Sequence, residues 1–333
     1  MSSPATRRPA VPRDELVKAL QQCLPADCLV LETETQRPFE CDALTIYRDL
    51  PLLVALPETV AQVQAVLRIC HRLDVPVVAR GSGTGLTAGS MPHPEGVLLV
   101  LSKLDRILKI DPLARTARVQ VGVSNLAISA AAAHHGLYYA PDPSSQIACS
   151  IGGNLASNSG GVHCLKYGLT VHNVLAAEVL TVEGERFTVG SQGLDSPGYD
   201  LLALFTGSEG LLGVAVEVTV RLLPTPELAR VVLAGFDSVG AAGDAVGAVI
   251  AAGIIPAGLE MMDRLAIQAA EDFAGAGYPR EAEALLLCEL DGTAAEVEDY
   301  IGRVQTLFRQ AGATSLRVSR DEQERALLWK GRK

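Results

Sequence analysis

A glycine-rich run, Arg80-Gly-Ser-Gly-Thr-Gly-Leu-Thr-Ala-Gly89, has the composition of a loop that binds phosphate. It follows residues 75–79, an apolar stretch that we expect to form a buried strand. Glycine lets the backbone approach a ligand closely, so successive N–H groups can donate to phosphate oxygens without help from lysine. The run therefore predicts a nucleotide diphosphate site. A surface turn without a ligand fits this loop, taken alone, equally well.

Two better-known phosphate loops do not fit this run. A Walker loop ends in Gly-Lys-Ser/Thr, and residues 80–89 contain no lysine. A Rossmann fingerprint opens a helix, whereas Pro92 and Pro94 follow here and lead into a predicted strand at 97–101.

Two further segments are rich in small residues. Residues 149–161 read Cys-Ser-Ile-Gly-Gly-Asn-Leu-Ala-Ser-Asn-Ser-Gly-Gly, and residues 206–214 read Thr-Gly-Ser-Glu-Gly-Leu-Leu-Gly-Val. Such segments expose backbone amides and let the chain pass close to a flat ring, while Ser150, Asn154 and Asn158 offer polar groups to its edge. Three glycine-rich bends attached to strands predict one extended ligand.

Periodicity indicates the elements that would position these bends. Thr59-Val-Ala-Gln62 is a capping box that opens a helix, and Cys70 falls on the apolar face of that helix. Ser124 begins an alanine-rich helix that ends at His134-His135-Gly136, where histidines suit a helix terminus better than a metal. Strands are expected at 97–101, 107–110, 116–121, 174–182, 185–189 and 213–223, with helices at 14–24 and 200–205.

Pro224-Thr225-Pro226 marks a predicted domain boundary, because strands and helices alternate regularly after it. Ser319-Arg-Asp-Glu322 reads as a capping box for a last helix that has no stop signal, from which we expect an incomplete protein or a fragment. The strands predicted here lie at 231–236, 259–262, 285–290 and 315–318, with a helix at 294–310.

Composition and charge argue against several classes of function. The net charge of -10, with no basic cluster, argues against nucleic-acid binding. Seven cysteines without repeated CxxC spacing predict reduced thiols and a cytoplasmic protein. The longest apolar region, 245–255, is too short for a transmembrane segment. Cys149, Cys164 and His163 could suggest a metal site. We expect them instead to belong to the core or to the cofactor wall, because their spacing does not supply the further ligands that a zinc site needs.

The blocks Arg80–Gly85, Ser150–Asn154, Lys166-Tyr-Gly168 and Gly207–Gly210 resemble the FAD-binding domain of the vanillyl-alcohol oxidase and p-cresol methylhydroxylase (PCMH) flavoproteins. Residues 140–154 and 161–172 are similar to the FAD-linked subunit of bacterial glycolate oxidase. The resemblance implies an α+β fold: an N-terminal helical segment (1–47), a two-subdomain PCMH-type FAD-binding domain (48–226), and an incomplete α/β, ferredoxin-like cap domain (227–333).

The same resemblance implies which residues contact the cofactor. FAD is expected to be noncovalent, because Thr84 stands where relatives with covalently linked flavin have histidine. No catalytic residue and no metal site is assigned, since the family's substrate-binding arginine and metal-binding residues are expected in later sequence. Tyr167 fits ordinary packing as well as FAD contact. The implied contacts are Gly81, Ser82, Gly83, Thr84, Gly85, Leu86, Asp142, Pro143, Ser144, Ser150, Gly152, Gly153, Asn154, Asn158, Gly160, Gly161, Tyr167, Glu209, Gly213 and Val214.

The implied activity is oxidation of a small 2-hydroxy acid, glycolate or D-lactate, to the 2-oxo acid by hydride transfer to the flavin N5. Partner subunits, one of them iron–sulfur, are expected to carry the electrons onward and could hold the protein at the inner membrane. No CxxCxxC run places that cluster in this chain. Two alternatives stay open: a truncated FAD-binding protein without catalysis of its own, and a reductase that takes hydride from NADPH.

Overall fold

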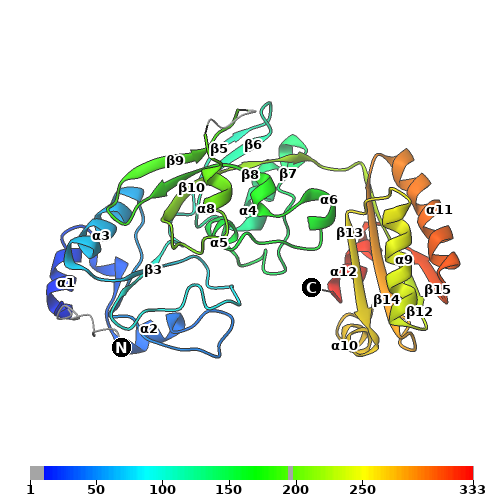
Figure 1. The fold of residues 1–333 in the computed structure, drawn as a ribbon, viewed down its shortest axis with the longest axis horizontal. Coiled ribbons are helices and arrows are strands. Elements are labelled where there is room, and N and C mark those ends of the chain that lie inside the picture. Colours follow the sequence, from blue (N-terminus) through cyan, green and yellow to red (C-terminus); the bar gives the residue numbers. More distant parts are fainter. Residues whose placement is uncertain (1–10, 194–197, 333) are drawn as a thin grey trace, which may run out of the picture. The chain divides into compact units, whose positions relative to one another are not determined.

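The computed structural model describes residues 11–193 and 198–332, which form two compact units (Figure 1). The first comprises the described residues of Met1–Tyr139, Ser145–Ser159 and Thr170–Leu223. The second comprises Ala140–Ser144, Gly160–Leu169 and the described part of Pro224–Lys333. The two short segments of the second unit thus interrupt the first unit in sequence. The division after Leu223 falls next to the proline pair at which a boundary is predicted.

The first unit begins with a small sheet in the spatial order β1-β2-β4-β3, in which β2 and β3 run parallel to β4. Helix α3 (Val60–Leu73) connects β2 to β3, and the predicted capping box is confirmed: Thr59 Oγ1 accepts from Gln62 N at 3.2 Å. The strand expected at 75–79 starts later, because Val75 still bonds to the end of α3 and Pro76 has no N–H. The strands are β1 (Leu29–Val30), β2 (Leu53–Ala55), β3 (Val77–Arg80) and β4 (Val97–Val100); α1 (Arg13–Leu20) precedes β1, and α2 (Thr33–Gln36) lies between β1 and β2.

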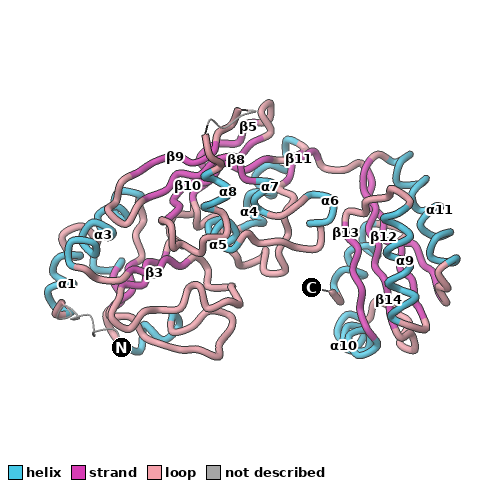
Figure 2. The backbone as a smooth tube through the Cα atoms, in the orientation of Figure 1, coloured by secondary structure: helices cyan, strands magenta, loops and turns pink. Residues whose placement is uncertain are grey.

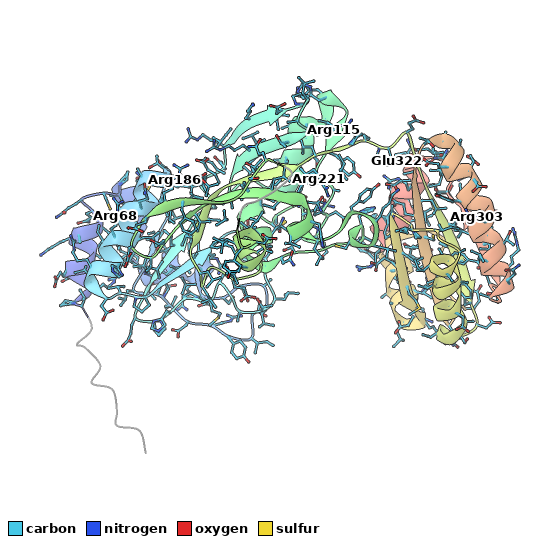
Figure 3. The ribbon with its side chains drawn as sticks, turned by 45° about the horizontal axis from the view of Figure 1, so that its top comes forward. Arg68, Arg115, Arg186, Arg221, Arg303 and Glu322 are labelled. Atoms are coloured by element: carbon cyan, nitrogen blue, oxygen red, sulfur yellow. The ribbon has the colours of Figure 1, made fainter. Side chains whose placement is uncertain are left out.

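A five-stranded antiparallel sheet completes the first unit, in the order β5-β6-β10-β8-β9. The alternation predicted along residues 213–223 does not separate a buried from an exposed face, because β10 is central and Glu217 and Thr219 are buried too. Glu217 accepts from Arg118 Nε at 2.9 Å, and Arg186 (labelled in Figure 3) approaches it at 3.5 Å. The strands are β5 (Ile107–Asp111), β6 (Thr116–Gln120), β8 (Val174–Leu180), β9 (Arg186–Gly190) and β10 (Val214–Arg221).

Short helices and loops link the strands of the first unit, and Figure 2 shows how much of it is loop. Ser124 caps α4, as predicted, and Gly136 closes the following turn with φ of 67°. The predicted helix at 14–24 ends earlier, at Leu20. The remaining elements are α4 (Asn125–Ala132), a 3₁₀ turn (Ala133–His135), β7 (Leu137–Tyr138), α5 (Ile151–Ser157), α7 (Thr170–Asn173), α8 (Leu201–Phe205) and β11 (Leu223–Pro224).

The second unit is a four-stranded antiparallel sheet in the order β13-β14-β12-β15, the ferredoxin-like arrangement. Alternate residues of β12 enter different cores. Val232 and Phe236 pack with α9 and α11, whereas Val231 and Leu233 pack with α10 and α12, so helices cover both faces (Figure 1). The elements are α6 (Cys164–Tyr167), β12 (Leu228–Phe236), α9 (Val239–Ala251), β13 (Gly258–Asp263), α10 (Arg264–Ala274), β14 (Ala284–Gly292), α11 (Ala294–Gln310), β15 (Ser315–Val318) and α12 (Glu322–Lys330).

The capping box predicted at Ser319 is wrong. Asp321 caps α12, since its Oδ1 accepts from Glu324 N at 2.8 Å. Ser319 Oγ instead accepts from Val231 N at 3.0 Å and so ties the chain to β12.

Candidate functional site

The first and second glycine-rich bends touch each other where β3 ends. A Cβ added to Gly81 would lie 2.4 Å from Ser150 Oγ and 3.6 Å from Gly153 N. Ser150 is fixed as the N-cap of α5, with its Oγ accepting from Gly153 N at 3.4 Å. Only glycine at position 81 allows this approach, so the sequence itself dictates the contact.

The third bend, residues 206–213, joins the other two. Gly207 N donates to Leu155 O and Glu209 N donates to Ala156 O, both at 2.9 Å, which fixes this bend to α5. Thr87 Oγ1 donates to Glu209 Oε1 at 3.3 Å, which links it to the first bend. The predicted convergence of the three bends is therefore present in the structure.

Glu209 has a backbone conformation that is rare for a residue with a side chain. Its φ is 52°, in the left-handed region. Such strain costs on the order of 1 kcal/mol and is found most often at functional sites.

The three bends line a cavity of about 60 Å³. This is smaller than a typical small-molecule pocket of roughly 300–1,000 Å³, and most of the lining is apolar. The lining residues are Ala79, Arg80, Gly81, Leu101, Val121, Ser150, Gly152, Gly153, Leu155, Ala156, Phe205, Glu209, Gly210, Gly213, Val214 and Ala215.

The backbone amides of the first and second bends differ in how much they can offer a ligand. Ile151 N and Gly152 N donate to Val123 O and Val121 O at 2.9 Å, so the expectation that this bend exposes its amides is wrong for these two residues. Among the described residues, in contrast, none accepts a hydrogen bond from the amides of residues 81–86. Of these two bends, the first therefore has the open donors: Gly81 lines the cavity, and Ser82 to Leu86 continue from it.

Seven of the residues predicted to contact a cofactor line the cavity: Gly81, Ser150, Gly152, Gly153, Glu209, Gly213 and Val214. Ser82 to Leu86 continue the first bend, and Asn154 and Asn158 lie on or just after α5. Asn158 Oδ1 accepts from Val171 N at 3.0 Å and so holds α7 in place. Asp142, Pro143, Ser144, Gly160, Gly161 and Tyr167 belong to the second unit.

Sequence reasoning missed the apolar lining. Leu101 and Val121 each follow directly on the last residue of a strand, β4 and β6. Their position at the C-terminal ends of these strands was a signal that could have identified them.

The second unit contains a buried ionic cluster centred on His163. Its Nδ1 lies 2.8 Å from Asp142 Oδ2, and its Nε2 lies 3.2 Å from Glu289 Oε1. Burial disfavours the protonated ring, but the hydrogen bonds to both carboxylates outweigh it and raise the pKa of His163 to about 10. His163 is thus a charged group held between two carboxylates, an arrangement that the sequence did not indicate.

Glu289, on β14, also holds helix α12. It accepts from Arg325 Nη1 at 3.0 Å and from Trp329 Nε1. Burial raises the pKa of Glu289, but the hydrogen bond from His163 and the nearby charge of Arg325 more than offset this, so the net shift is downward.

A second pair of contacts fixes α6 to the same strand. Lys166 Nζ donates to Asp291 Oδ1, and Tyr167 OH donates to Asp291 Oδ2 at 2.5 Å. Cys164 Sγ accepts from Gly161 N at 2.9 Å, which gives that thiol a local structural role.

No group of three or more His, Cys, Asp and Glu side chains in the described part of the chain is arranged to hold a metal. None of its helices combines the length and the apolar character needed to cross a bilayer.

Comparison with known proteins gives two family matches. Residues 51–190 match the FAD binding domain, and residues 225–333 match the C-terminal domain of FAD linked oxidases. Glycolate oxidase subunit GlcD of Escherichia coli K12 is 61% identical over 98% of this chain and 65% of its own length. GlcD of Bacillus subtilis is 38% identical over 89% and 63%, and D-lactate dehydrogenase of Anaerostipes hadrus is 31% identical over 92% and 66%.

Solved structures agree on the fold. An alkyldihydroxyacetonephosphate synthase superposes with a TM-score of 0.82 at 18% identity, covering 98% of this chain and 65% of that one. Substrate-bound p-cresol methylhydroxylase superposes with a TM-score of 0.78 at 18% identity, covering 96% and 68%. The chain spans 63–66% of the length of the three relatives named above.

Proposed function

Because this chain belongs to the FAD-linked oxidases and its cofactor is FAD, we propose that it is the flavin-binding subunit of a 2-hydroxy-acid dehydrogenase of the glycolate oxidase type. The substrate is glycolate or D-lactate, and the product is the corresponding 2-oxo acid. Bound FAD supplies the acceptor for the hydride that leaves Cα of the substrate. The single observation that carries this proposal is the 61% identity to a glycolate oxidase subunit over nearly the whole chain.

The backbone around the cavity of the first unit suits the diphosphate of such a cofactor. The open amides of residues 81–86 would donate to the diphosphate, in the manner of a backbone anion nest. Gly81 and Gly153 pack closely against each other at the end of β3. The cavity wall there therefore offers a ligand backbone atoms rather than side chains. Of the other site residues assigned from the sequence, those of the first unit would complete the wall, with FAD held noncovalently because Thr84 offers no ring nitrogen for a covalent bond.

In this proposal, the residues of the chain bind and orient the cofactor and the substrate. The apolar lining of the cavity would shield the bound cofactor from water. The proton of the substrate hydroxyl must pass to a basic group, which we do not assign to a residue of this chain. Electrons would leave through partner subunits in the cytoplasm, one of them iron–sulfur, as a subunit of a larger oxidase requires.

Anaerobic reduction of the purified flavoprotein tests this proposal. Glycolate or D-lactate should bleach the flavin absorbance near 450 nm. A flavin that neither acid reduces would refute the catalytic role and leave a binding protein, and bleaching by NADPH alone would identify the reductase type.

A further inference from the structure

Arg80 lies at the end of β3 and is the one cation among the described residues that line the cavity. Only 7% of it is exposed. Burying a guanidinium is costly unless an anion or several acceptors compensate it. The described residues provide Arg80 with no ion pair; its partners among them are two backbone carbonyls and the Phe39 ring, whose centroid lies 6.0 Å from Cζ.

The hydrogen bonds of Arg80 leave one edge of the guanidinium directed at the first bend. Nη1 donates to Cys41 O at 2.8 Å and to Ser90 O at 3.4 Å. The other two nitrogens lie against Gly83: a Cβ built on that glycine would be 2.2 Å from Nη2 and 2.9 Å from Nε. The free edge therefore supports the same loop whose amides are open.

A neighbouring carboxylate does not neutralise this charge. Asp42 Oδ1 accepts from Leu44 N at 2.9 Å, while its Oδ2 is buried without a partner among the described residues. Burial lowers the pKa of Arg80, and the charge of Asp42 only partly offsets this. An anion bound at the first bend would stabilise the guanidinium further.

We propose that Arg80 is the positive charge that holds the FAD diphosphate at the first bend and makes the cavity selective for phosphorylated flavins over riboflavin. This inference rests on the proposed FAD site. It adds a cationic binding residue to a loop whose sequence suggested that backbone amides act alone. A charge-assisted contact of this kind is about twice as strong as a neutral hydrogen bond.

The test is to titrate apoprotein with FAD and with riboflavin, for the wild type and for Arg80→Gln. The FAD dissociation constant should rise about 10- to 100-fold in the variant, while that of riboflavin changes less than about 2-fold. The dependence of FAD binding on salt should also weaken, because one charge contact is lost. Arg80→Lys keeps the charge and should recover a large part of the FAD affinity.

Arg68→Gln is the matched control. Arg68 (labelled in Figure 3) also lies against a glycine with positive φ, Gly184, and donates to its carbonyl at 3.1 Å, but it does not line the cavity. It should bind FAD as the wild type does. Equal weakening of FAD and riboflavin by Arg80→Gln would overturn the proposal and show a purely structural role for Arg80. So would unchanged FAD affinity.

If Arg80→Gln does not fold, the FAD affinities of the wild type and of Arg80→Lys, measured at increasing salt concentration, test the proposal instead. Salt-independent FAD affinity in the wild type would overturn the proposal. A wild-type protein that binds no FAD at all would instead refute the proposed function, so the two failures can be told apart.

Discussion

Replacing His163 by glutamine should make the stability of the second unit respond differently to pH. Glutamine can keep a hydrogen bond to Asp142 or Glu289 but carries no charge. The pKa of His163 is about 10 in the folded protein against 6.5 for an ordinary histidine. Because the folded-state pKa is raised, the contribution of His163 is fully present below pH 6.5 and is lost as pH rises through about 10.

The size of the stability change follows from the pH range over which the contribution of His163 is lost. Each pKa unit corresponds to about 1.4 kcal/mol, so two pH units could remove up to about 2.7 kcal/mol of stability. The His163 side chain is 22% exposed and its carboxylate partners can rearrange. We therefore expect the advantage of wild type over His163→Gln to fall by about 1–3 kcal/mol between pH 6.5 and 8.5.

Urea unfolding followed by tryptophan fluorescence measures this difference. Trp329 is the single tryptophan of the chain, is 5% exposed, and contacts Glu289, so it reports on the cluster itself. His163 is also the one histidine in the sequence segments of the second unit. The charged groups that face it are Asp142 and Glu289, with Arg325 behind Glu289.

A matched control is His71→Gln, which removes a histidine that lies 3.9 Å from Glu183 and is half exposed. Its curve should follow the wild type within about 0.5 kcal/mol at every pH. Parallel pH curves for wild type and His163→Gln would refute the reasoning, because they would mean that the imidazole is not charged between its two carboxylates.

Two further substitutions test the packing of the bends and the cap of α12. Gly81→Ala should weaken FAD binding at least about 10-fold in a fluorescence titration, since its Cβ would meet Ser150 Oγ at 2.4 Å; Gly243→Ala, with open space around it, should bind FAD normally. Asp321→Ala should cost about 1 kcal/mol in urea unfolding through loss of the cap, and an unchanged midpoint would count against the assignment of this N-cap.

Local signals in the sequence were sufficient where the chain's own neighbours decide the structure. The capping box at Thr59 and the helix at 294–310 were predicted correctly, because each depends on residues three or four positions apart. The cap at Ser319 was not, because its hydroxyl is occupied by Val231, which lies 88 residues away in sequence. No local pattern indicates that competition.

The candidate site shows the same limit. The glycines at 81, 153 and 210 could be recognised as parts of one site because three similar bends occur at strand ends. The carbonyls of Val121 and Val123 accept hydrogen bonds from the amides of residues 152 and 151. These bonds depend on how β6 packs against α5, which the periodicity of the sequence does not reveal. The ionic cluster of Asp142, His163 and Glu289 likewise depends on distant residues, because His163 and Glu289 are 126 positions apart.

Hydrogen–deuterium exchange with and without FAD tests the central claim most directly, namely that three bends form one cofactor site. The amides of residues 81–86 have no acceptor among the described residues and should exchange rapidly in the apoprotein. On addition of FAD, these amides should become protected together with those of Gly210 and Gly213, which line the cavity and likewise have no acceptor among the described residues, whereas Ile151 and Gly152 should change little because they are already bonded. Protection confined to one bend, or none at residues 81–86, would contradict the account.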